Sequence, residues 1–445
     1  MRLAALLSLL LPCAATAAEP PLLFRNATLI TMDAPGVLEG HDLLVQDGRI
    51  ARIATGIAAP DGATIVDATG RYLLPGLAEM HAHVPGAEPA GYAEDVLLLY
   101  LAHGQTAIRG MLGQPAHLDM RARLARGELL GPRLFTSGPS VNGNSAPDAA
   151  TAARMVREQK AAGYDFVKIH PGLEPGVFDA LVEAANEAGI PFAGHVSAKV
   201  GVRRALAARQ SAIDHLDQYV EALADGSCID DELPAGFFGI ERTDCADAKR
   251  IPELVTATRE AGSWMAPTQV LIEQWAQPPR AEDLRRRPAW RFVSPRMAQQ
   301  WQDARARFAA AAPRAERFIE LRRELLRQMH AAGVPILLAS DAPQVFNVPG
   351  DAALAELELY GEIGLSPPDA LATGTVNVAR FFGQEDRFGR LREGLEADIL
   401  LLGGDPLADL ANVRRLEGVM VRGRWLPRAR LDEILDGVAA RQAGR

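Results

Sequence analysis

Hydrophobic and polar residues alternate along the first part of the chain. The segments NATLITMD and DLLVQDGRIARI carry β-branched residues in this pattern, and Asp47-Gly48 marks a hairpin turn between short strands. Strand-like texture returns near the other end of the chain in GRLREGLEADILLLGGDPLADL and GVMVRGRW. We therefore expect residues 19–75 and 384–445 to pair into one small β-sandwich domain.

The middle of the chain has a different pattern. Short apolar runs alternate there with helical segments such as TAARMVREQKAAG and FDALVEAANEAG. The runs are LAEMHAHV, QTAIRGM, RLFTSG, DFVKIH, PFAGHV, AIDHLD, WMAPTQV and PILLASD. Eight strand-then-helix units favour a closed parallel barrel over an open sheet. We predict an α/β protein whose residues 76–383 form a (β/α)8 TIM barrel.

One long polar segment, residues 278–333, interrupts this alternation between the last two strands. It is rich in Arg and Gln, and RAERFIELRRELLRQMHAAG has strong helical periodicity with several Glu/Arg neighbours. We expect its arginines to lie on a solvated face. The segment is a candidate for a lid over the barrel or for a contact between subunits.

The first residues have the pattern of a secretory signal. Arg2 supplies a positive start, an apolar run from Leu3 to Leu11 follows, and small residues around Ala17 offer a cleavage site. The apolar run is too short to span a bilayer comfortably. We expect residues 1–18 to be removed and the protein to be exported, periplasmic or secreted, with no membrane attachment after cleavage.

Charge and cysteine content narrow the classes of partner. The 445 residues carry a formal net charge of −9, and no basic arm is present, which argues against nucleic acid as a partner. Signal cleavage would leave two cysteines, Cys228 and Cys245. An even pair in an exported protein predicts a disulfide, with two free buried thiols as the alternative.

Polar residues close several of the apolar runs. His81 and His83 end the first, and two residues one apart point to the same side of a strand. Lys168, His195, His215 and Asp341 stand in or at the ends of later strands. In a parallel barrel these ends meet on one face, where active sites lie. A group of four imidazoles, a carboxylate and a lysine predicts a metal centre.

These residues and their flanks resemble the amidohydrolase superfamily. HAH matches the family's HxH pattern, and Lys168, the two later histidines and the final aspartate follow in its binuclear order. The flanking LLPGLAEMHAHV, SDAP, TGTVNVARFFG and GRLREGLEADILLLGGDPL agree as well. The resemblance covers nearly all of the chain after the signal. It is strongest to imidazolonepropionase- and prolidase-like members, a group that includes Xaa-Pro and Xaa-Arg dipeptidases and ochratoxin-hydrolysing enzymes.

The resemblance implies a site for two divalent metal ions, with zinc as the default. His81, His83 and Asp341 would hold the more buried ion, and His195 and His215 the more exposed one. Lys168 would carry a carbamate derived from CO2 and bridge both. A plain ammonium cannot ligate a cation, because it has three donors and no acceptor, whereas a carbamate presents two anionic oxygens. The alternative for Lys168 is an ion pair beside a single metal.

The same resemblance implies hydrolysis by a hydroxide shared between the metals. Asp341 would act as general base and then pass the proton to the leaving amine. We expect cleavage of an amide C–N bond in a dipeptide or N-acyl amino acid. A lactone, cyclic amide or ester is the first alternative, and a non-catalytic metal-binding protein is the second. Related enzymes often form oligomers, so we also expect a homo-oligomer.

Substrate-recognising residues are harder to find. The candidates are Arg109, Tyr219, His170, Gln344 and Asn347, all in or near the ends of predicted strands. Arg109 could pair with a substrate carboxylate, since arginine binds carboxylates in a bidentate manner. Tyr219 could hydrogen-bond the scissile carbonyl. For each of these residues a purely structural role is the alternative.

Overall fold

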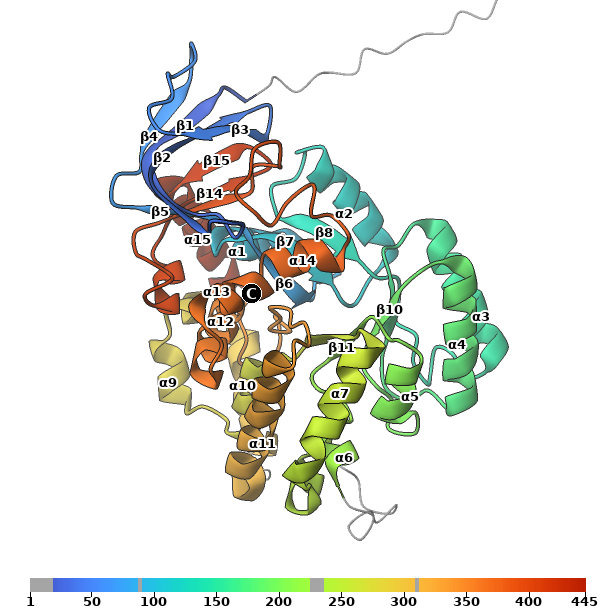
Figure 1. Ribbon diagram of the computed structural model, residues 1–445. Helices are drawn as coiled ribbons and strands as arrows, with labels where there is room; N and C mark the ends of the chain where they lie inside the picture. Colours follow the sequence, from blue (N-terminus) through green and yellow to red (C-terminus); the bar gives the residue numbers. More distant parts are fainter. Residues whose placement is uncertain (1–18, 87–89, 225–235, 309–311) are drawn as a thin grey trace, which may run out of the picture.

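The computed structural model describes residues 19–86, 90–224, 236–308 and 312–445 (Figure 1). The predicted signal peptide, residues 1–18, lies outside these residues, as does Cys228. No helix within the described ranges is both long and apolar enough to cross a membrane.

A β-sheet built from both ends of the chain lies beside the helical part of the molecule (Figure 1). Its strands are hydrogen-bonded in the order β15-β14-β13-β5-β1-β2-β3, and β4 pairs with β1. The join between the two chain ends is the antiparallel pairing of β13 with β5. The strands are β1 (Leu22–Ile30), β2 (Val37–Gln46), β3 (Arg49–Ala54), β4 (Thr64–Asp67), β5 (Tyr72–Pro75), β13 (Ile399–Leu402), β14 (Leu416–Val421) and β15 (Arg424–Pro427).

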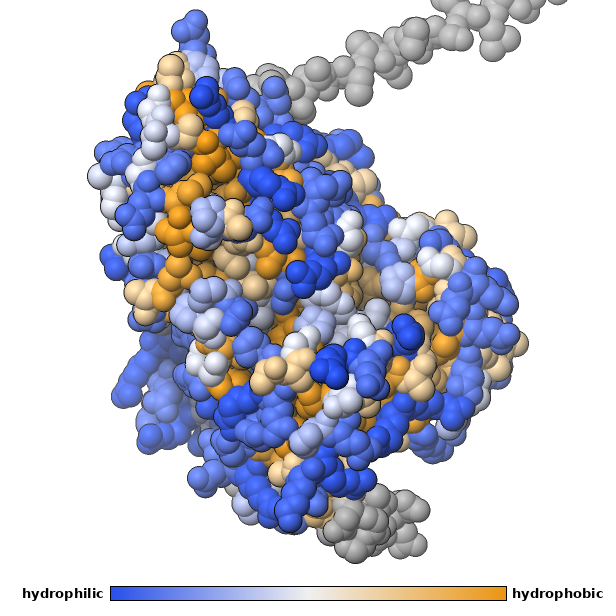
Figure 2. Space-filling view, viewed as in Figure 1, coloured by the Kyte–Doolittle hydropathy of each residue, from blue (hydrophilic) through white to orange (hydrophobic). Residues whose placement is uncertain are grey.

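This sheet confirms that the two chain ends combine, although its strands belong to one sheet and not to two separate ones. Phe24, Leu73 and Ile399 are buried together in its core, and the Trp425 ring meets the Phe24 ring edge-on at 5.1 Å. Apolar residues that lie far apart in the sequence thus share one core. Figure 2 shows a hydrophobic band over the same part of the molecule.

Two parallel sheets form the centre of the helical part. One contains β6 (Leu77–Ala82), β7 (Gln105–Gly110) and β8 (Arg133–Thr136). The other contains β9 (Val167–Ile169), β10 (Phe192–Gly194), β11 (Ala212–Asp214) and β12 (Trp264–Ala266). Parallel bridges connect Ser137 with Phe166, Met265 with Ile336, and Ala342 with Ala82. Each parallel strand therefore lies beside its neighbour in sequence.

Helices follow the parallel strands, as the alternating pattern predicts. Helix α3 begins where the Asp148 side chain accepts a hydrogen bond from Thr151 N, which caps a free backbone donor. The helices outside the long polar segment are α1 (Tyr92–Ala102), α2 (Pro115–Ala125), α3 (Ala149–Ala162), α4 (Pro175–Ala188), α5 (Gly201–Ala207), α6 (Tyr219–Leu223), α7 (Ile251–Ala261), α8 (Gln269–Ala276), α12 (Asp351–Ile363), α13 (Pro367–Thr373), α14 (Val376–Phe381) and α15 (Arg428–Ala443).

The polar segment before the last strand folds into α9 (Ala281–Arg286), α10 (Pro295–Phe308) and α11 (Ala312–Ala331). Most of its arginines are exposed, but the expectation of a fully solvated set is wrong for Arg322. The Arg322 side chain is completely buried, and its Nε donates to Gln269 Oε1 at 3.0 Å. Helix α11 therefore turns one guanidinium into the protein.

Candidate metal centre

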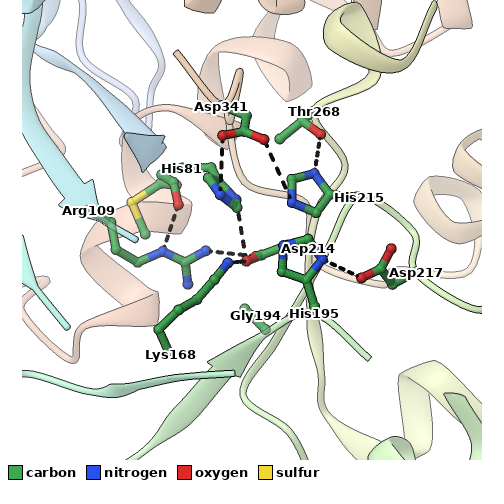
Figure 3. Close-up of polar contacts among 12 residues, drawn as sticks. His81, Arg109, Lys168, Gly194, His195, Asp214, His215, Asp217, Thr268 and Asp341 are labelled. Atoms are coloured by element: carbon green, nitrogen blue, oxygen red, sulfur yellow. Dashed lines mark hydrogen bonds and ion pairs between the residues drawn. The ribbon is translucent and has the colours of Figure 1, made fainter. Parts of the chain in front are cut away.

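Histidine rings from four parallel strands gather at one place in the fold, and Figure 3 shows those of His81, His195 and His215. The ring of His215, after β11, lies 4.6 Å from the rings of both His81 in β6 and His195 after β10. His83 lies 5.4 Å from His81, and His170, after β9, lies 4.9 Å from His195. The carboxyl ends of these strands meet, as expected for a site on a parallel sheet.

Asp341 completes this group from the loop after the last strand. Its Oδ1 lies 2.7 Å from His83 Nε2 and 3.5 Å from His81 Nε2, and its Oδ2 lies 3.8 Å from His215 Nε2. Burial alone would raise the pKa of Asp341, but His81 and His83 outweigh it and lower the pKa below its ordinary value. Asp341 is therefore an anion facing three imidazoles.

Two of the imidazoles are fixed by hydrogen bonds at Nδ1. His195 Nδ1 lies 2.6 Å from Asp217 Oδ2, and His215 Nδ1 lies 2.7 Å from Thr268 Oγ1. Burial and the neighbouring His195 and His81 lower the pKa of His215 well below its usual range, which favours the neutral ring. Each ring thereby keeps its Nε2 for another partner, which is the arrangement that metal-binding histidines adopt.

Lys168 and Arg109 approach the site through a shared carboxylate, Lys168 from below and Arg109 from the left in Figure 3. Lys168 Nζ lies 2.6 Å from Asp214 Oδ2, and Arg109 Nη2 lies 3.2 Å from Asp214 Oδ1. Burial would raise the pKa of Asp214, but Lys168 and His81 lower it well below its ordinary value. Asp214 Oδ2 also lies 3.3 Å from His81 Nδ1, so this carboxylate connects the lysine with the histidine group.

A glycine makes room for the lysine. Gly194 has a φ of +125°, and a Cβ at this position would lie 2.4 Å from Ile169 O and 2.8 Å from Lys168 Cδ. No other residue type fits both the backbone conformation and the space. The residue before His195 is therefore dictated by the passage of the Lys168 side chain.

Glu79 joins the first and last strands behind the centre. Its buried carboxylate accepts hydrogen bonds from His81 N at 2.8 Å and from Ser340 N at 2.9 Å, and it also bonds the Ser340 hydroxyl. Burial raises the pKa of Glu79 to about 7. One contact is with the backbone of His81 itself, and the other is with Ser340, the residue before Asp341. Glu79 therefore positions His81 and Asp341 relative to each other.

The structure corrects two predicted substrate contacts. Arg109 is completely buried, with its Nε donating to Met80 O at 2.6 Å and its Nη2 facing Asp214. Its guanidinium therefore supports the site from within and is not exposed to a substrate carboxylate. Tyr219 is also completely buried, and its hydroxyl lies 2.8 Å from Thr258 Oγ1 in α7. It packs between helices instead of facing the centre.

The other three candidates for substrate recognition differ in their surroundings. His170 is half-buried beside His195, and its Nδ1 has no hydrogen-bond partner in the described part of the protein. Asn347 is buried and donates to Ser340 O at 2.7 Å, so it holds the loop that carries Asp341. Gln344 is half-buried and lines a cavity beside that loop.

The donor set fits a metal ion. Ligand atoms from His81, His215 and Asp341 lie within 4.8 Å of one another, and all three residues are buried. Neutral imidazoles and a carboxylate are ligands that suit divalent metals such as zinc. The ring of His83 also contacts His81, and the ring of His195 contacts His215. These four imidazoles offer more nitrogen ligands than hydrogen bonding to one carboxylate, Asp341, would need.

Comparison with known families agrees with this geometry. A model of the amidohydrolase family matches residues 72–426, which include all the predicted metal ligands. The chain belongs to the amidohydrolase family.

Curated relatives of this amidohydrolase match it over limited stretches. An adenine deaminase of Paracoccus denitrificans is 31% identical over 206 residues, which are 42% of this chain and 34% of the deaminase. A dihydroorotase of Mycobacterium tuberculosis is 51% identical over 60 residues, or 13% of each chain. The chain thus spans about a third of the length of that deaminase.

Solved structures similar to this amidohydrolase match it over most of its length. Bottromycin amidohydrolase aligns with a TM-score of 0.72 and 25% identity, covering 96% of this chain and 90% of that one. A Xaa-Pro dipeptidase with bound methionine has a TM-score of 0.66 at 19% identity, covering 92% and 100%. The ochratoxinase of A. niger has a TM-score of 0.64 at 19% identity, covering 92% and 96%. The last two likenesses concern the fold alone.

Three acidic residues of the site in this amidohydrolase were not predicted from its sequence, namely Glu79, Asp214 and Asp217. A signal was present for Glu79, since residues 79 and 81 alternate along β6 and share a face of the strand. Asp214 and Asp217 flank His215 in the run AIDHLD. Carboxylates this close to a predicted ligand are candidates for orienting it.

Proposed function

We propose that this protein is a metal-dependent amidohydrolase that cleaves an amide C–N bond in a dipeptide or an N-acyl amino acid. The observation that carries the proposal is the buried group of His81, His215 and Asp341, whose ligand atoms lie within 4.8 Å. The similarity to bottromycin amidohydrolase, at 25% identity, supports an amide as the substrate. A lactone, cyclic amide or ester opened at the same centre is the alternative.

The fold proposed for this activity is a closed (β/α)8 barrel. Its support is the set of three parallel bridges, from Ser137 to Phe166, from Met265 to Ile336 and from Ala342 to Ala82. The first bridge connects the two parallel sheets directly. The other two connect the opposite edges of these sheets to the last predicted strand, which lies between them. A closed barrel brings the metal-binding residues of the first, fifth, sixth and last strands to one face.

Two divalent ions, zinc by default, would be held by these strand ends. His81, His83 and Asp341 would bind one ion, His195 and His215 the other, and a carbamate on Lys168 would bridge them. Once bound, the ions supply the Lewis acidity that makes water a nucleophile near neutral pH. The support for a modified Lys168 is its complete burial and its contact with Asp214, the carboxylate that also lies beside His81.

Asp341 is the proton carrier of the proposed reaction. Its Oδ1 and Oδ2 face different imidazoles, and its low pKa leaves it ionised at neutral pH. An ionised carboxylate can accept a proton from the attacking water and deliver it to the leaving nitrogen. Asn347 holds the backbone of the preceding Ser340, which keeps Asp341 in place during both transfers.

The substrate class is tested by turnover. Zinc-reconstituted protein without residues 1–18 is assayed against dipeptides, N-acyl amino acids and lactones, with Asp341→Asn as the inactive control. Release of amine that disappears in the control supports the proposal. Opening of lactones alone would replace it with the first alternative. Metal uptake without turnover of any compound would favour a non-catalytic metal-binding protein.

Export and assembly belong to the same proposal. We propose that the protein acts outside the cytoplasm as a homo-oligomer and binds neither nucleic acid nor membrane. The supporting observations are the signal pattern in residues 1–18, the acidic net charge of −9, and Cys245, which forms a disulfide. Its predicted partner is Cys228, so non-reducing and reducing mass maps should differ by this bridge.

A further inference from the structure

A cavity of about 710 Å³ lies beside the loops that continue from His83 and from Asp341. Pro85, two residues after His83, and Pro343, two residues after Asp341, form part of its wall. The wall also contains residues of α10 and of α15. The cavity thus borders the loops that follow the first and last strands, and its volume suits a small organic ligand.

Two guanidinium side chains, those of Arg296 and Arg445, line this cavity, and its wall contains no Asp or Glu side chain. Arg296, at the start of α10, forms no hydrogen bond or ion pair with another described residue. Arg445 Nη1 lies 2.7 Å from the buried Asp95, but Arg441 binds the same carboxylate, so Asp95 does not neutralise both. A ligand carboxylate entering here would meet an unpaired cation.

Apolar side chains make up much of the remaining wall. Tyr92, Met297 and Trp301 contribute to it, and the Tyr92 hydroxyl contacts Met297 Sδ at 3.7 Å. The Arg445 guanidinium lies over the Tyr92 ring at 5.3 Å, which fixes both side chains. The chemistry of the wall therefore suits an organic anion with an apolar body.

We infer that this cavity binds the amino-acid half of the substrate, with its carboxylate on Arg296 and its side chain against Met297 and Trp301. The inference rests on the proposed function, because Asp341 delivers its proton to the leaving nitrogen and Pro343, two residues later, lines the cavity. The group attached to that nitrogen is thereby placed on this side of the centre. Gln300 and Gln344 add uncharged polar groups to the same wall.

Binding tests this inference independently of turnover. Calorimetry on zinc-loaded Asp341→Asn protein compares N-acetyl-L-phenylalanine and N-acetyl-L-proline with their carboxamides. Arg296→Gln, in the same background, removes the unpaired cation. Arg307→Gln is the matched control, since Arg307 is an exposed arginine of the same helix outside the cavity wall.

We expect at least one acid to bind about tenfold more tightly than its carboxamide, and Arg296→Gln to abolish this preference while Arg307→Gln retains it. In enzyme with Asp341 intact, Arg296→Gln should raise KM for the acid by about tenfold and leave kcat nearly unchanged. No binding, no preference, or a preference that survives Arg296→Gln would overturn the inference. Acid-selective binding without hydrolysis would uphold the cavity and reject the proposed function.

Discussion

Lys168 Nζ lies 2.6 Å from Asp214 Oδ2, and both side chains are completely buried. Arg109 approaches the other oxygen of the same carboxylate, so Asp214 is shared by two cations. The lysine thus reaches the metal-binding group as part of a charged network, and its removal changes the balance of charge beneath the site.

Replacing Lys168 with alanine should reduce activity by at least about 100-fold and remove at least one metal ion per chain, because no other described group can bridge from this strand. Metal content is measured by elemental analysis and activity by amine release. The control is Lys199→Ala, which removes an exposed lysine paired with Glu174. Full activity in the Lys168 variant would refute the bridging role.

Replacing His81 with alanine should abolish binding of the more buried metal ion. His81 lies at the centre of the group, with His83, His215 and Asp341 around it. The comparison is His41→Ala, in which a histidine is removed from β2 in the terminal sheet. An unchanged metal content in the His81 variant would contradict the assignment of the HxH pair.

Replacing Asp217 with asparagine should weaken binding of the more exposed ion by about 10- to 100-fold, since the carboxylate holds His195 at Nδ1. Metal affinity is measured by competition with a chelator. Asp179→Asn provides the control, because that carboxylate pairs with Arg204 on the surface. If both variants bound metal like the parent protein, Asp217 would have no role in positioning the ring.

Replacing Gly194 with alanine should reduce activity by about 100-fold, because the new Cβ would collide with Ile169 O and the Lys168 side chain. Gly189→Ala is a matched control, since Gly189 also has a positive φ but open space around it. That control should lose only about 1 kcal/mol of stability and keep its activity. Equal activities of the two variants would show that Lys168 does not depend on this space.

Glu356 should make the protein less stable as the pH rises. Burial raises the pKa of Glu356 to about 8, from an ordinary value of 4.5. Between these values the folded state keeps the proton and the unfolded state releases it, so stability falls as pH increases through this window. Glu356→Gln cannot ionise and should show a smaller decline in Tm from about pH 5 to pH 8.

The comparison for Glu356 concerns slopes and not absolute stabilities. Its two oxygens accept hydrogen bonds from Gln269 N and Val270 N, and glutamine offers only one acceptor, which should cost about 1–3 kcal/mol at every pH. Glu183→Gln, at an exposed position in α4, should leave the slope unchanged. Parallel Tm curves for parent and Glu356→Gln proteins would contradict the prediction.

The residues predicted to bind metal could be selected from the sequence because each stands in or at the end of an apolar run. Strand alternation fixes the direction of such side chains, so His81 and His83 could be placed together from their spacing alone. The contact of both with Asp341 follows from the parallel order of the strands, which the alternating strand and helix pattern predicts.

The direction of a side chain could not be predicted from the sequence where tertiary packing sets it. Gln218 adopts a left-handed conformation just before α6, and the Tyr219 hydroxyl meets Thr258. The sequence predicted that Arg109 binds a substrate carboxylate, but its guanidinium hydrogen-bonds the buried Asp214 instead. Arg322 resembles its exposed neighbours in α11 and is buried only because Gln269 and Pro267 O lie opposite. Each depends on a partner distant in the sequence.

The Glu79–Ser340 contact joins residues 261 positions apart. Such a contact must overcome a large loss of loop-closure entropy, so contacts of high sequence separation form slowly. His81 and Asp341 are adjacent to the two ends of this contact, so the complete ligand set does not exist in a partly folded chain. Capture of metal should therefore coincide with the last step of folding, and the rate at which refolding protein takes up metal would measure when the first and last strands meet.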